Sequence, residues 1–470
     1  MTRPLVIVSN RLPIVVKNDA DGGWNVEPSS GGLVTALRPI LKQRGGAWIG
    51  WLGAAEGAPV DELLGIVGEE IGCRFTSVEL STRLVNDFYY GFSNETLWPL
   101  FHDLLGHTNF DLTKWLAYEE SNAIFAKVVH EADTEGAIVW VNDYQLMLVG
   151  SELRKLEFKN PLAFFLHIPF PSPDIFARLP WREKILRGLL CFDLIGLQVT
   201  RDLLNFVACV REFIPDAEVE RSGAFATIRI DGATVRAGAF PISIDSKSFE
   251  ETARSEEVRN ACERVHREYP DRHILLGVDR LDYTKGLIVK CRAYERALEK
   301  YPDLHRNVTL LQIVIPSRQD IPEYSKWKAR MDQTIGEING RFGRRGWMPL
   351  HYFYRAVDFT DLLGYYRAAD VCLVTPLKDG MNLVAKEYCA SCIDDNGVLV
   401  LSEFAGAAAQ LQDALIVNPN DNERMADAIY EAAKMPLAER QRRMARLRQE
   451  VRTNDVFVWV ANFLGEFPGA

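Results

Sequence analysis

The segment from Val278 to Gly286 contains the most specific arrangement of charged residues in the sequence. It reads VDRLDYTKG and follows an apolar run, so Arg280 and Lys285 lie in a loop between a predicted strand and a predicted helix. A guanidinium grips phosphate oxygens with a planar fork, and an ammonium adds a point charge. The following helix N-terminus would add N–H donors and a positive dipole. These features predict a metal-free diphosphate site. The alternative is a surface loop in which the cations pair with Asp279 and Asp282.

Other side chains with useful chemistry also come directly after apolar runs. Asp143 follows AIVWVN, His167 follows LAFFL, and Arg318 stands in a Pro-Ser-Arg turn after another run. Arg318 repeats the phosphate-binding device of Arg280. For His167 the alternative is a histidine satisfied within the core, and no further ligands at short spacing indicate a zinc site. The sequence therefore predicts no metal site and no bound cofactor.

Two further segments combine glycine with helix starts. Gly31 and Gly32 precede a helix-like segment, where the main chain could approach a phosphate or a sugar; the alternative is a plain turn. The pattern is neither GxGxxG nor a Walker A loop, which argues against NAD and ATPase functions. Asp379 ends a loop, and a helix begins over 383–387. A carboxylate in this segment can bind the vicinal hydroxyls of a ribose, unless it serves only in an ion pair.

The elements that position these residues follow from short apolar runs alternating with amphipathic segments. Continuous apolar runs are typical of parallel strands that are covered on both faces. Strand–helix–strand alternation predicts doubly wound sheets with right-handed crossovers. The predicted strands are 5–9, 47–51, 138–141, 163–167, 194–198, 235–240, 274–278, 308–315, 350–354, 371–374, 398–402 and 415–417, and two of the predicted helices are 287–300 and 423–435.

A domain boundary is predicted near Pro241–Ser248, where a strand ends and a charged helix-like stretch over 249–269 begins. The predicted fold class is α/β, with two Rossmann-like doubly wound domains that face a central cleft. The predicted domains are 1–243, 244–455 and a C-terminal helix within 456–470 that packs back on the first domain. Ligands of such sheets bind outside the carboxyl ends of the strands, which is where the polar residues above are found.

Composition excludes several classes of protein. The chain has 470 residues, with 54 Lys and Arg against 64 Asp and Glu, a net charge of −10 that argues against a general nucleic-acid binder. The absence of a long apolar run and of a secretory leader predicts a cytoplasmic protein without membrane contact, whose eight cysteines are free thiols. The CxxC pair Cys389 and Cys392 is expected in the core, and the Arg-rich stretch 440–452 is expected to be a solvated helix face.

Together these segments resemble a known family. The motifs VSNRLP, SSGGL, GGAWIGW, FYYGFSNETLWPLFH, NDYQLM, FFLHIPFP, GVDRLDYTKG, PSR, TPLKDGMNLVAKEY and VLVLSEFAGAA occur in this order. The chain is similar in this respect to the UDP-forming trehalose-6-phosphate synthases, retaining glycosyltransferases of family 20. The similarity covers nearly the whole chain, and the chain stops after one catalytic unit. The resemblance implies the glycosyltransferase B fold, a homo-oligomer (often a tetramer in relatives), and UDP-glucose and glucose 6-phosphate as substrates.

The resemblance also implies roles for individual residues. The phosphate end of glucose 6-phosphate would be held by Arg11, Tyr89, Trp98 and Arg318, and acceptor hydroxyls by Asp143. The glycines Gly31 and Gly32 would lie against the sugar diphosphate, which Arg280 and Lys285 would bind. The donor glucose would be held by His167 and Asp379, and the ribose by Glu387. Further donor contacts would come from Leu383, Val384, Ala385 and Lys386, the first three through main-chain N–H groups.

One departure from the family pattern affects the expected acceptor. The family has HDYHL where this chain has NDYQL, so Asn142 and Gln145 replace two histidines beside Asp143. The alternatives are therefore a glucosylglycerol-phosphate synthase or another enzyme with a sugar-phosphate acceptor, a polymer-extending glucosyltransferase, and a non-catalytic sugar-phosphate sensor. The sensor could lose the donor residues, which this chain keeps, and a polymer-extending enzyme has no use for a phosphate pocket.

Overall fold

The computed structural model describes residues 3–18, 24–28, 37, 46–53, 64–65, 68, 73–132, 134, 136–317 and 322–467. The chain divides into two compact units. Unit 1 comprises Met1–Ile242 and Val456–Ala470, and unit 2 comprises Ser243–Asp455. Each unit has its own sheet and its own core, so each is described separately.

The sheet of unit 1 has nine strands in the order β5-β4-β1-β6-β7-β8-β11-β10-β9. The strands from β5 to β11 are parallel to their neighbours, whereas β10 and β9 extend the edge as antiparallel strands. The bounds are β1 (Leu5–Arg11), β4 (Ala47–Trp51), β5 (Arg74–Ser77), β6 (Ile138–Asn142), β7 (Leu162–Phe165), β8 (Leu194–Leu197), β9 (Glu218–Ser222), β10 (Phe225–Ile230) and β11 (Ala233–Ala239). A separate hairpin pairs β2 (Ile14–Asn18) with β3 (Trp24–Pro28).

The helical elements of unit 1 include one long π-helix. The bounds are α3 (Thr82–Leu84), the π-helix η1 (Val85–Leu97), α4 (Trp98–Phe101), η2 (Leu105–His107), α5 (Leu112–Glu131), η3 (Tyr144–Leu146), α6 (Val149–Lys155), α7 (Pro173–Phe176), α8 (Arg182–Leu189), α9 (Thr200–Phe213) and α18 (Val456–Leu464). Helix α18 packs on the sheet, since the Trp459 and Phe463 rings lie 5.2 and 4.8 Å from the Trp140 ring of β6. This contact places the end of the chain in unit 1.

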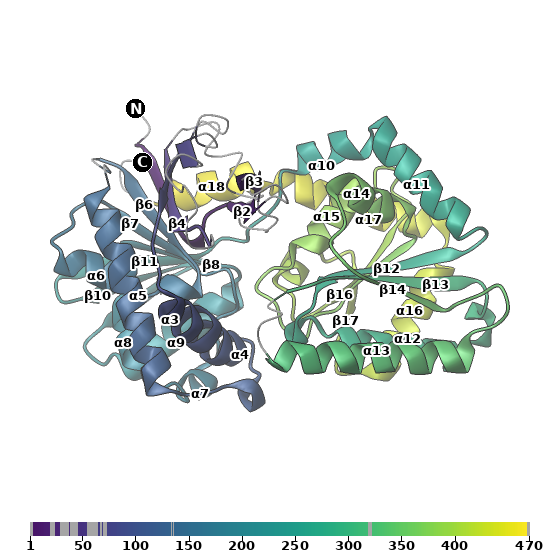
Figure 1. The fold of residues 1–470 in the computed structure, drawn as a ribbon, viewed down its shortest axis with the longest axis horizontal. Coiled ribbons are helices and arrows are strands. Elements are labelled where there is room, and N and C mark those ends of the chain that lie inside the picture. The colour runs from purple at the N-terminus through teal and green to yellow at the C-terminus, as the bar shows by residue number, and fades with distance from the viewer. Residues whose placement is uncertain are drawn as a thin grey trace. The chain divides into compact units, whose positions relative to one another are not determined.

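Unit 2 contains a six-stranded parallel sheet in the order β14-β13-β12-β15-β16-β17. Its strands are β12 (His273–Arg280), β13 (Val308–Ile315), β14 (Leu350–Tyr354), β15 (Val371–Val374), β16 (Val398–Ser402) and β17 (Leu415–Val417). Its helical elements are α10 (Ser246–Ala253), α11 (Glu256–Glu268), η4 (Tyr283–Lys285), α12 (Leu287–Lys300), η5 (Pro302–Leu304), α13 (Pro322–Phe342), α14 (Phe359–Ala368), α15 (Leu383–Ser391), η6 (Gly406–Ala409), α16 (Asn422–Lys434) and α17 (Leu437–Thr453). Helices α11 and α14 cover one face of this sheet, and α12, α13 and α16 cover the other (Figure 1).

The predicted α/β class with two doubly wound sheets is confirmed. Continuous burial explains the parallel strands, because β1, β6, β7 and β12 have almost no exposed residues before their last position. In each sheet the strand order reverses at one point, between β1 and β6 in unit 1 and between β12 and β15 in unit 2. Such a reversal opens a crevice at the carboxyl ends of the two strands, which is where ligands of doubly wound sheets bind.

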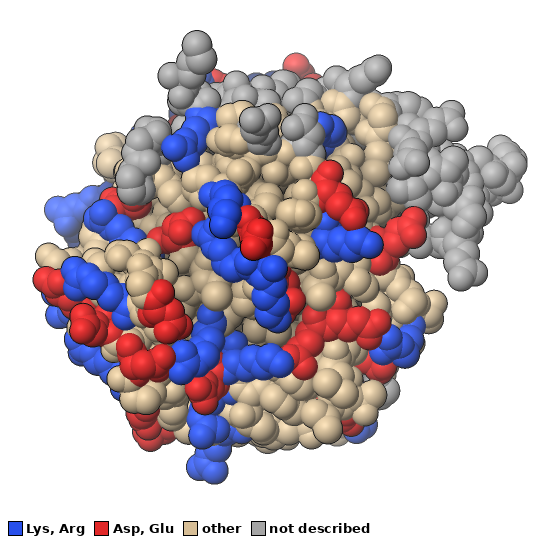
Figure 2. Space-filling view, turned by 90° about the vertical axis from the view of Figure 1, so that its left-hand side faces the viewer, with Lys and Arg blue, Asp and Glu red and all other residues tan. Residues whose placement is uncertain are grey.

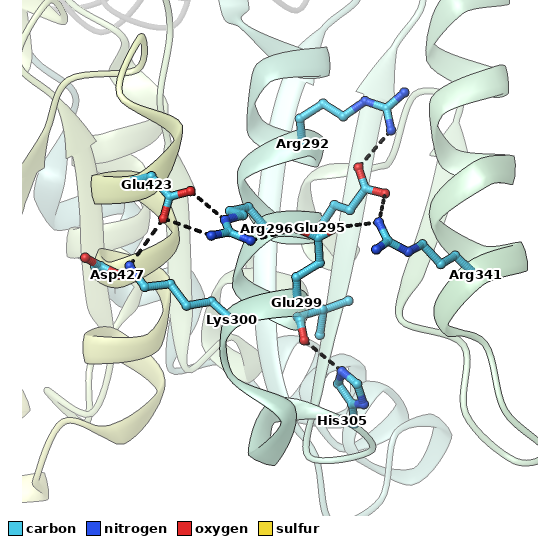
Figure 3. Close-up of polar contacts among 10 residues, drawn as sticks. Arg292, Glu295, Arg296, Glu299, Lys300, His305, Arg341, Glu423 and Asp427 are labelled. Carbon is cyan, nitrogen blue, oxygen red and sulfur yellow. Dashed lines mark hydrogen bonds and ion pairs between the residues drawn. The ribbon is translucent and has the colours of Figure 1, made fainter.

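Ion pairs connect helix α12, between Arg292 and Lys300, to helices α13 and α16 (Figure 3). Arg296 and Lys300 of α12 pair with Glu423 and Asp427 of α16, at 2.6 Å in both cases. On the other side, Arg292 of α12 pairs with Glu337 of α13 at 2.5 Å. Exposed pairs contribute little each, but a network that links three helices restricts how α12 can tilt. The N-terminus of α12 follows directly on the loop that carries Arg280 and Lys285.

Two predictions about helices are corrected by the structure. The predicted stretch 249–269 is two helices, because the Ser255 hydroxyl accepts the Val258 N–H and starts α11 anew after α10. The arginine-rich helix α17 is not simply a solvated face. Arg440 and Arg448 are buried, and they pair with Asp370 at 3.3 Å and with Asp395 at 2.6 Å.

The surface and the cysteines agree with the composition. Lys and Arg alternate with Asp and Glu over the face of unit 1 that Figure 2 shows. All eight cysteines are free, and Cys389 and Cys392 are buried. No helix in the described ranges has the length and apolar character needed to cross a bilayer. The described residues also contain no group of three His, Cys, Asp or Glu placed to hold a metal.

Candidate functional site

In unit 1 a cationic and aromatic cluster lies at the carboxyl end of β1. Arg11 is the last residue of β1 and is opposite Trp51, the last residue of β4, in the strand register. The Arg11 guanidinium lies 4.5 Å from the centre of the Trp51 ring and 5.6 Å from that of Tyr89. Cation–π contacts hold a guanidinium in place without neutralising its charge. Arg11 is exposed, so it remains available to an anion.

A hydrogen-bond chain connects this cluster to Trp98. The Asn94 side chain donates to the Tyr89 carbonyl at 2.6 Å and accepts the Tyr144 hydroxyl at 2.8 Å. The Tyr144 ring lies 5.7 Å from the Trp98 ring. Tyr89 and Asn94 belong to the π-helix η1, a rare form that is frequent at functional sites. The structure thus connects Arg11, Tyr89 and Trp98, which the resemblance assigned to one phosphate pocket.

Two consecutive residues at the end of β6 hold His167. Asp143 has a positive φ of 76°, a strained main-chain conformation of a kind found at active sites, and its carboxylate accepts the His167 N–H at 3.1 Å. The Asn142 Oδ1 lies 3.1 Å from the His167 Nε2. Burial lowers the pKa of His167 to about 3, so the imidazole is neutral. Asp143 and His167 therefore follow adjacent parallel strands, as predicted.

In unit 2, Arg280 ends β12 at the point where the strand order reverses. Its side chain is exposed and makes no hydrogen bond or ion pair with the described residues. The loop that follows is rigid, because the Asp282 carboxylate accepts both the main-chain N–H and the hydroxyl of Thr284 at 2.9 Å. Gly286 has a φ of 65°, and a Cβ there would lie 2.7 Å from the Thr375 carbonyl oxygen, so only glycine fits.

Lys285 does not pair with the carboxylates nearest in sequence. Its ammonium forms an ion pair with Asp379, which also accepts the Asn382 side-chain N–H at 3.1 Å. Asp279 instead forms a buried pair with Lys290 at 2.6 Å. The alternative of a simple surface loop, with Asp279 and Asp282 as the partners, is therefore wrong. Lys285 and Asp379 lie together after the two strands at which the order of the sheet reverses.

Helix α15 starts beside this pair. Asn382 has a φ of 69° and precedes the helix without a side-chain cap, so its first N–H groups lack a side-chain partner at that position. Glu387 accepts the Tyr366 hydroxyl at 2.9 Å, and burial raises its pKa. The Lys386 side chain is buried and donates to the Gln410 Oε1 at 2.8 Å. The side chain of Lys386 is thus directed into unit 2, so a contact between Lys386 and a donor would have to come from its main chain.

The buried ammonium of Lys386 predicts a pH-dependent stability. Burial lowers its pKa from 10.5 to about 7. Between these values the unfolded chain binds a proton that the folded chain does not bind, so the free energy of unfolding increases with pH. Relative to Lys386→Met, the wild type should gain up to about 1.4 kcal/mol per pH unit between about pH 7 and pH 9. Urea unfolding at several pH values measures this, and parallel curves for the two proteins would contradict it.

Some predicted residues lie outside the described ranges, and some site residues were not predicted. Gly31, Gly32 and Arg318 belong to the first group. The second group is Trp51, Asn142 and Asn382. Trp51 contacts Arg11 through its ring, and Asn142 and Asn382 form hydrogen bonds with His167 and Asp379, respectively. Trp51 could have been found from its position at the end of an apolar strand. Asn142 has the same position at the end of an apolar strand, whereas Asn382 carries no comparable signal.

The model of the family described as "Glycosyltransferase family 20" matches residues 3–468. The chain belongs to glycosyltransferase family 20. Among curated relatives in this family, the trehalose-6-phosphate synthase of Mycobacterium sp. strain JLS is 43% identical over 465 residues, which cover 98% of this chain and 95% of the relative. That of Mycolicibacterium vanbaalenii is also 43% identical, over 98% of this chain and 94% of the relative.

Solved structures of family 20 enzymes match over the same length. The alpha,alpha-trehalose-phosphate synthase (UDP-forming) of Burkholderia xenovorans in complex with glucose-6-phosphate has a TM-score of 0.89 at 36% identity, covering 98% of this chain and 99% of that chain. A structure from E. coli bound with UDP-2-fluoro glucose has a TM-score of 0.87 at 36% identity, covering 98% of both chains. The glycosyltransferase B architecture expected from the sequence is therefore confirmed.

Proposed function

We propose that this chain is a retaining glucosyltransferase that makes α,α-trehalose 6-phosphate and UDP from UDP-glucose and glucose 6-phosphate. The observation that carries the proposal is the match along 98% of the chain to enzymes that are named for this reaction, one of them bound to glucose-6-phosphate. The reaction is the first step of trehalose biosynthesis. It requires one site for a sugar phosphate and one for a nucleotide sugar.

Unit 1 supplies the acceptor residues in this proposal except Arg318, which belongs to unit 2. Arg11 and Arg318 bind the phosphate of glucose 6-phosphate, Tyr89 and Trp98 line its pocket, and Asp143 binds sugar hydroxyls. The support is that Arg11 keeps its charge exposed while Trp51 and Tyr89 fix its position. Fixing the remote phosphate orients the reacting hydroxyl, which converts binding energy into rate.

Unit 2 binds the donor through Arg280 and Lys285 on the diphosphate, the first N–H groups of α15, and Glu387 on the ribose. Gly31 and Gly32 add main-chain contacts, and His167 and Asp379 contact the glucosyl group. As the bond from the anomeric carbon to the diphosphate breaks, negative charge grows on the departing oxygen. Fixed cations and N–H dipoles stabilise that charge more in the transition state than in the ground state. The acceptor O1 attacks from the same face, and its proton passes to the leaving phosphate oxygen.

The test is a grid of donors and acceptors with product identification. UDP-glucose with glucose 6-phosphate should release UDP and yield a phosphorylated α,α-linked disaccharide, identified by NMR. GDP-glucose and ADP-glucose in place of the donor test nucleotide choice, and glycerol 3-phosphate in place of glucose 6-phosphate tests acceptor choice. Binding of both sugars without turnover would support the sensor instead.

Replacing Arg11 by alanine should act selectively on the acceptor. A hydrogen bond to a charged group contributes about 1.5–3 kcal/mol, so the KM for glucose 6-phosphate should rise roughly 10- to 150-fold. The KM for UDP-glucose should not change. Arg229→Ala, which removes an exposed arginine from the same unit, is the matched control. Equal increases in both KM values would count against the acceptor assignment.

We also propose that the enzyme is a homo-oligomer, with a tetramer as the expected form. Support comes from Leu112 and Leu116, which lie one turn apart on α5 and are 61% and 54% exposed. Large apolar side chains that are this exposed on one helix face often mark an interface. Light scattering of the wild type and of Leu112→Glu/Leu116→Glu measures the number of chains. A wild type that is monomeric at micromolar concentration overturns the proposal.

A further inference from the structure

Asn142 is the only residue in the described structure that contacts the imidazole nitrogen Nε2 of His167 by a hydrogen bond. It is fully buried and is the last residue of β6. The next residue, Asp143, accepts the main-chain N–H of His167 at 3.1 Å. The ring and the main chain of His167 are thus both held by one dipeptide on the neighbouring strand.

The orientation of the Asn142 amide follows from its other partners. Its Nδ2 lies 3.0 Å from the Trp140 carbonyl oxygen and 3.4 Å from the Val8 carbonyl oxygen. Carbonyl oxygens only accept hydrogen bonds, so the nitrogen end of the amide must face them. The reversed amide would place oxygen against two oxygens. The Oδ1 of Asn142 therefore faces His167, as the structure has it.

This orientation determines which nitrogen of His167 carries the proton. An amide oxygen only accepts, so the Nε2 that lies 3.1 Å from it must donate. A neutral imidazole carries one proton, and burial keeps this ring neutral. The proton is then on Nε2, and Nδ1 has a free lone pair. A ring in this tautomer can accept a hydrogen bond from a sugar hydroxyl through Nδ1 and cannot donate one there.

We propose that Asn142 is a positioning residue that holds His167 as the Nε2–H tautomer, so that Nδ1 accepts a hydroxyl of the glucosyl group. The inference rests on the proposed function for the identity of that group. It deepens that function by assigning a role to a buried residue that the proposed mechanism does not otherwise use. An asparagine suits the position because it offers an acceptor to the ring while its own donors are occupied by main-chain carbonyls.

The test combines nitrogen NMR with kinetics. The protein is labelled with ¹⁵N-histidine, and the His167 signals are assigned by their loss in His167→Gln. We expect the wild-type ring to be neutral with the proton on Nε2. In Asn142→Leu the proton should no longer be held on Nε2, and kcat should fall about 10- to 100-fold, by analogy with the loss of the outer hydrogen-bond partner of a metal-binding histidine. The KM for glucose 6-phosphate should stay unchanged.

Gln198→Leu is the matched control. Gln198 donates to the His167 carbonyl at 3.5 Å and accepts the Ile242 N–H at 3.1 Å, so its loss loosens the same segment without touching the ring. It should lower stability and leave the tautomer as in the wild type. A wild-type proton on Nδ1, or an Asn142→Leu protein with the wild-type tautomer and kcat, overturns the inference. If Asn142→Leu does not fold, the position of the ring proton in the wild-type spectrum still tests the inference. A wild type that transfers no glucose overturns the proposed function instead, since the tautomer is measured without turnover.

Discussion

Alanine in place of Arg280 or Lys285 should lower kcat about 100- to 1000-fold while the fold stays intact. Loss of a single fixed donor from a site of developing negative charge has this cost, roughly 3–4 kcal/mol. Arg280 is the exposed last residue of β12 and Lys285 is the last residue of η4, so neither belongs to the core of the sheet. The measurement is UDP release at saturating concentrations of both substrates, with circular dichroism and the Tm to monitor the fold.

The two variants should differ in degree, because their surroundings differ. Arg280 has no carboxylate partner among the described residues, so Arg280→Ala removes one positive charge and nothing else. Lys285→Ala also leaves the Asp379 carboxylate without its cation, and that negative charge would oppose the growing charge on the diphosphate. Lys285→Ala should therefore be the slower enzyme. Adding Asp379→Asn would remove the repulsion but also a proposed glucose contact.

Lys247→Ala is the matched control for both variants. Lys247 lies on α10 in the same unit, and its side chain is 81% exposed. Its loss should leave kcat and the Tm at their wild-type values. Near-normal turnover in Arg280→Ala or in Lys285→Ala would refute the diphosphate role of that residue.

The parallel core of each sheet could be predicted from the sequence because its strands are buried on both faces. The strands β4, β13, β15 and β16 begin and end at the predicted residues. Strands with one exposed face could not be predicted in this way. In β10 buried positions alternate with exposed or partly exposed ones, and β9 has four exposed residues of five, so neither has a continuous apolar run.

The individual residues of the candidate site could be predicted from the sequence, but not which of them contact each other. Strand ends identified Arg280, Lys285 and Asp379, because polar side chains after buried strands meet at one edge of a parallel sheet. The pairing of Lys285 with Asp379 joins residues 94 positions apart. Sequence proximity favoured Asp279 and Asp282 instead. Asp279 is occupied by Lys290, a contact that depends on how α12 packs, whereas Asp282 caps the N-terminus of η4.

Removing one partner of the ion pair between Asp279 and Lys290 should destabilise unit 2 more than breaking any of its exposed ion pairs. The side chains of Asp279 and Lys290 are 3% and 0% exposed, and the Gln312 Nε2 also donates to the Asp279 Oδ2 at 3.1 Å. Lys290→Met leaves a buried carboxylate without a cation. Such a loss costs about 3–5 kcal/mol of the free energy of unfolding. Urea unfolding followed by circular dichroism measures it, with the exposed Lys247→Met, expected within about 0.5 kcal/mol of wild type, as control.

The double variant Asp279→Asn/Lys290→Met separates the charge from the shape of the site. It removes both charges, and the asparagine oxygen still accepts the N–H of Gln312, so no buried ion remains unpaired. Replacing a whole buried pair by neutral groups is often neutral or stabilising, so the double variant should recover most of the stability that Lys290→Met loses. Additive losses in the two single variants and the double variant would show that the pair is not coupled. Recovery would show that the loss in Lys290→Met comes from leaving the Asp279 carboxylate buried without a cation, because neither group tolerates burial alone.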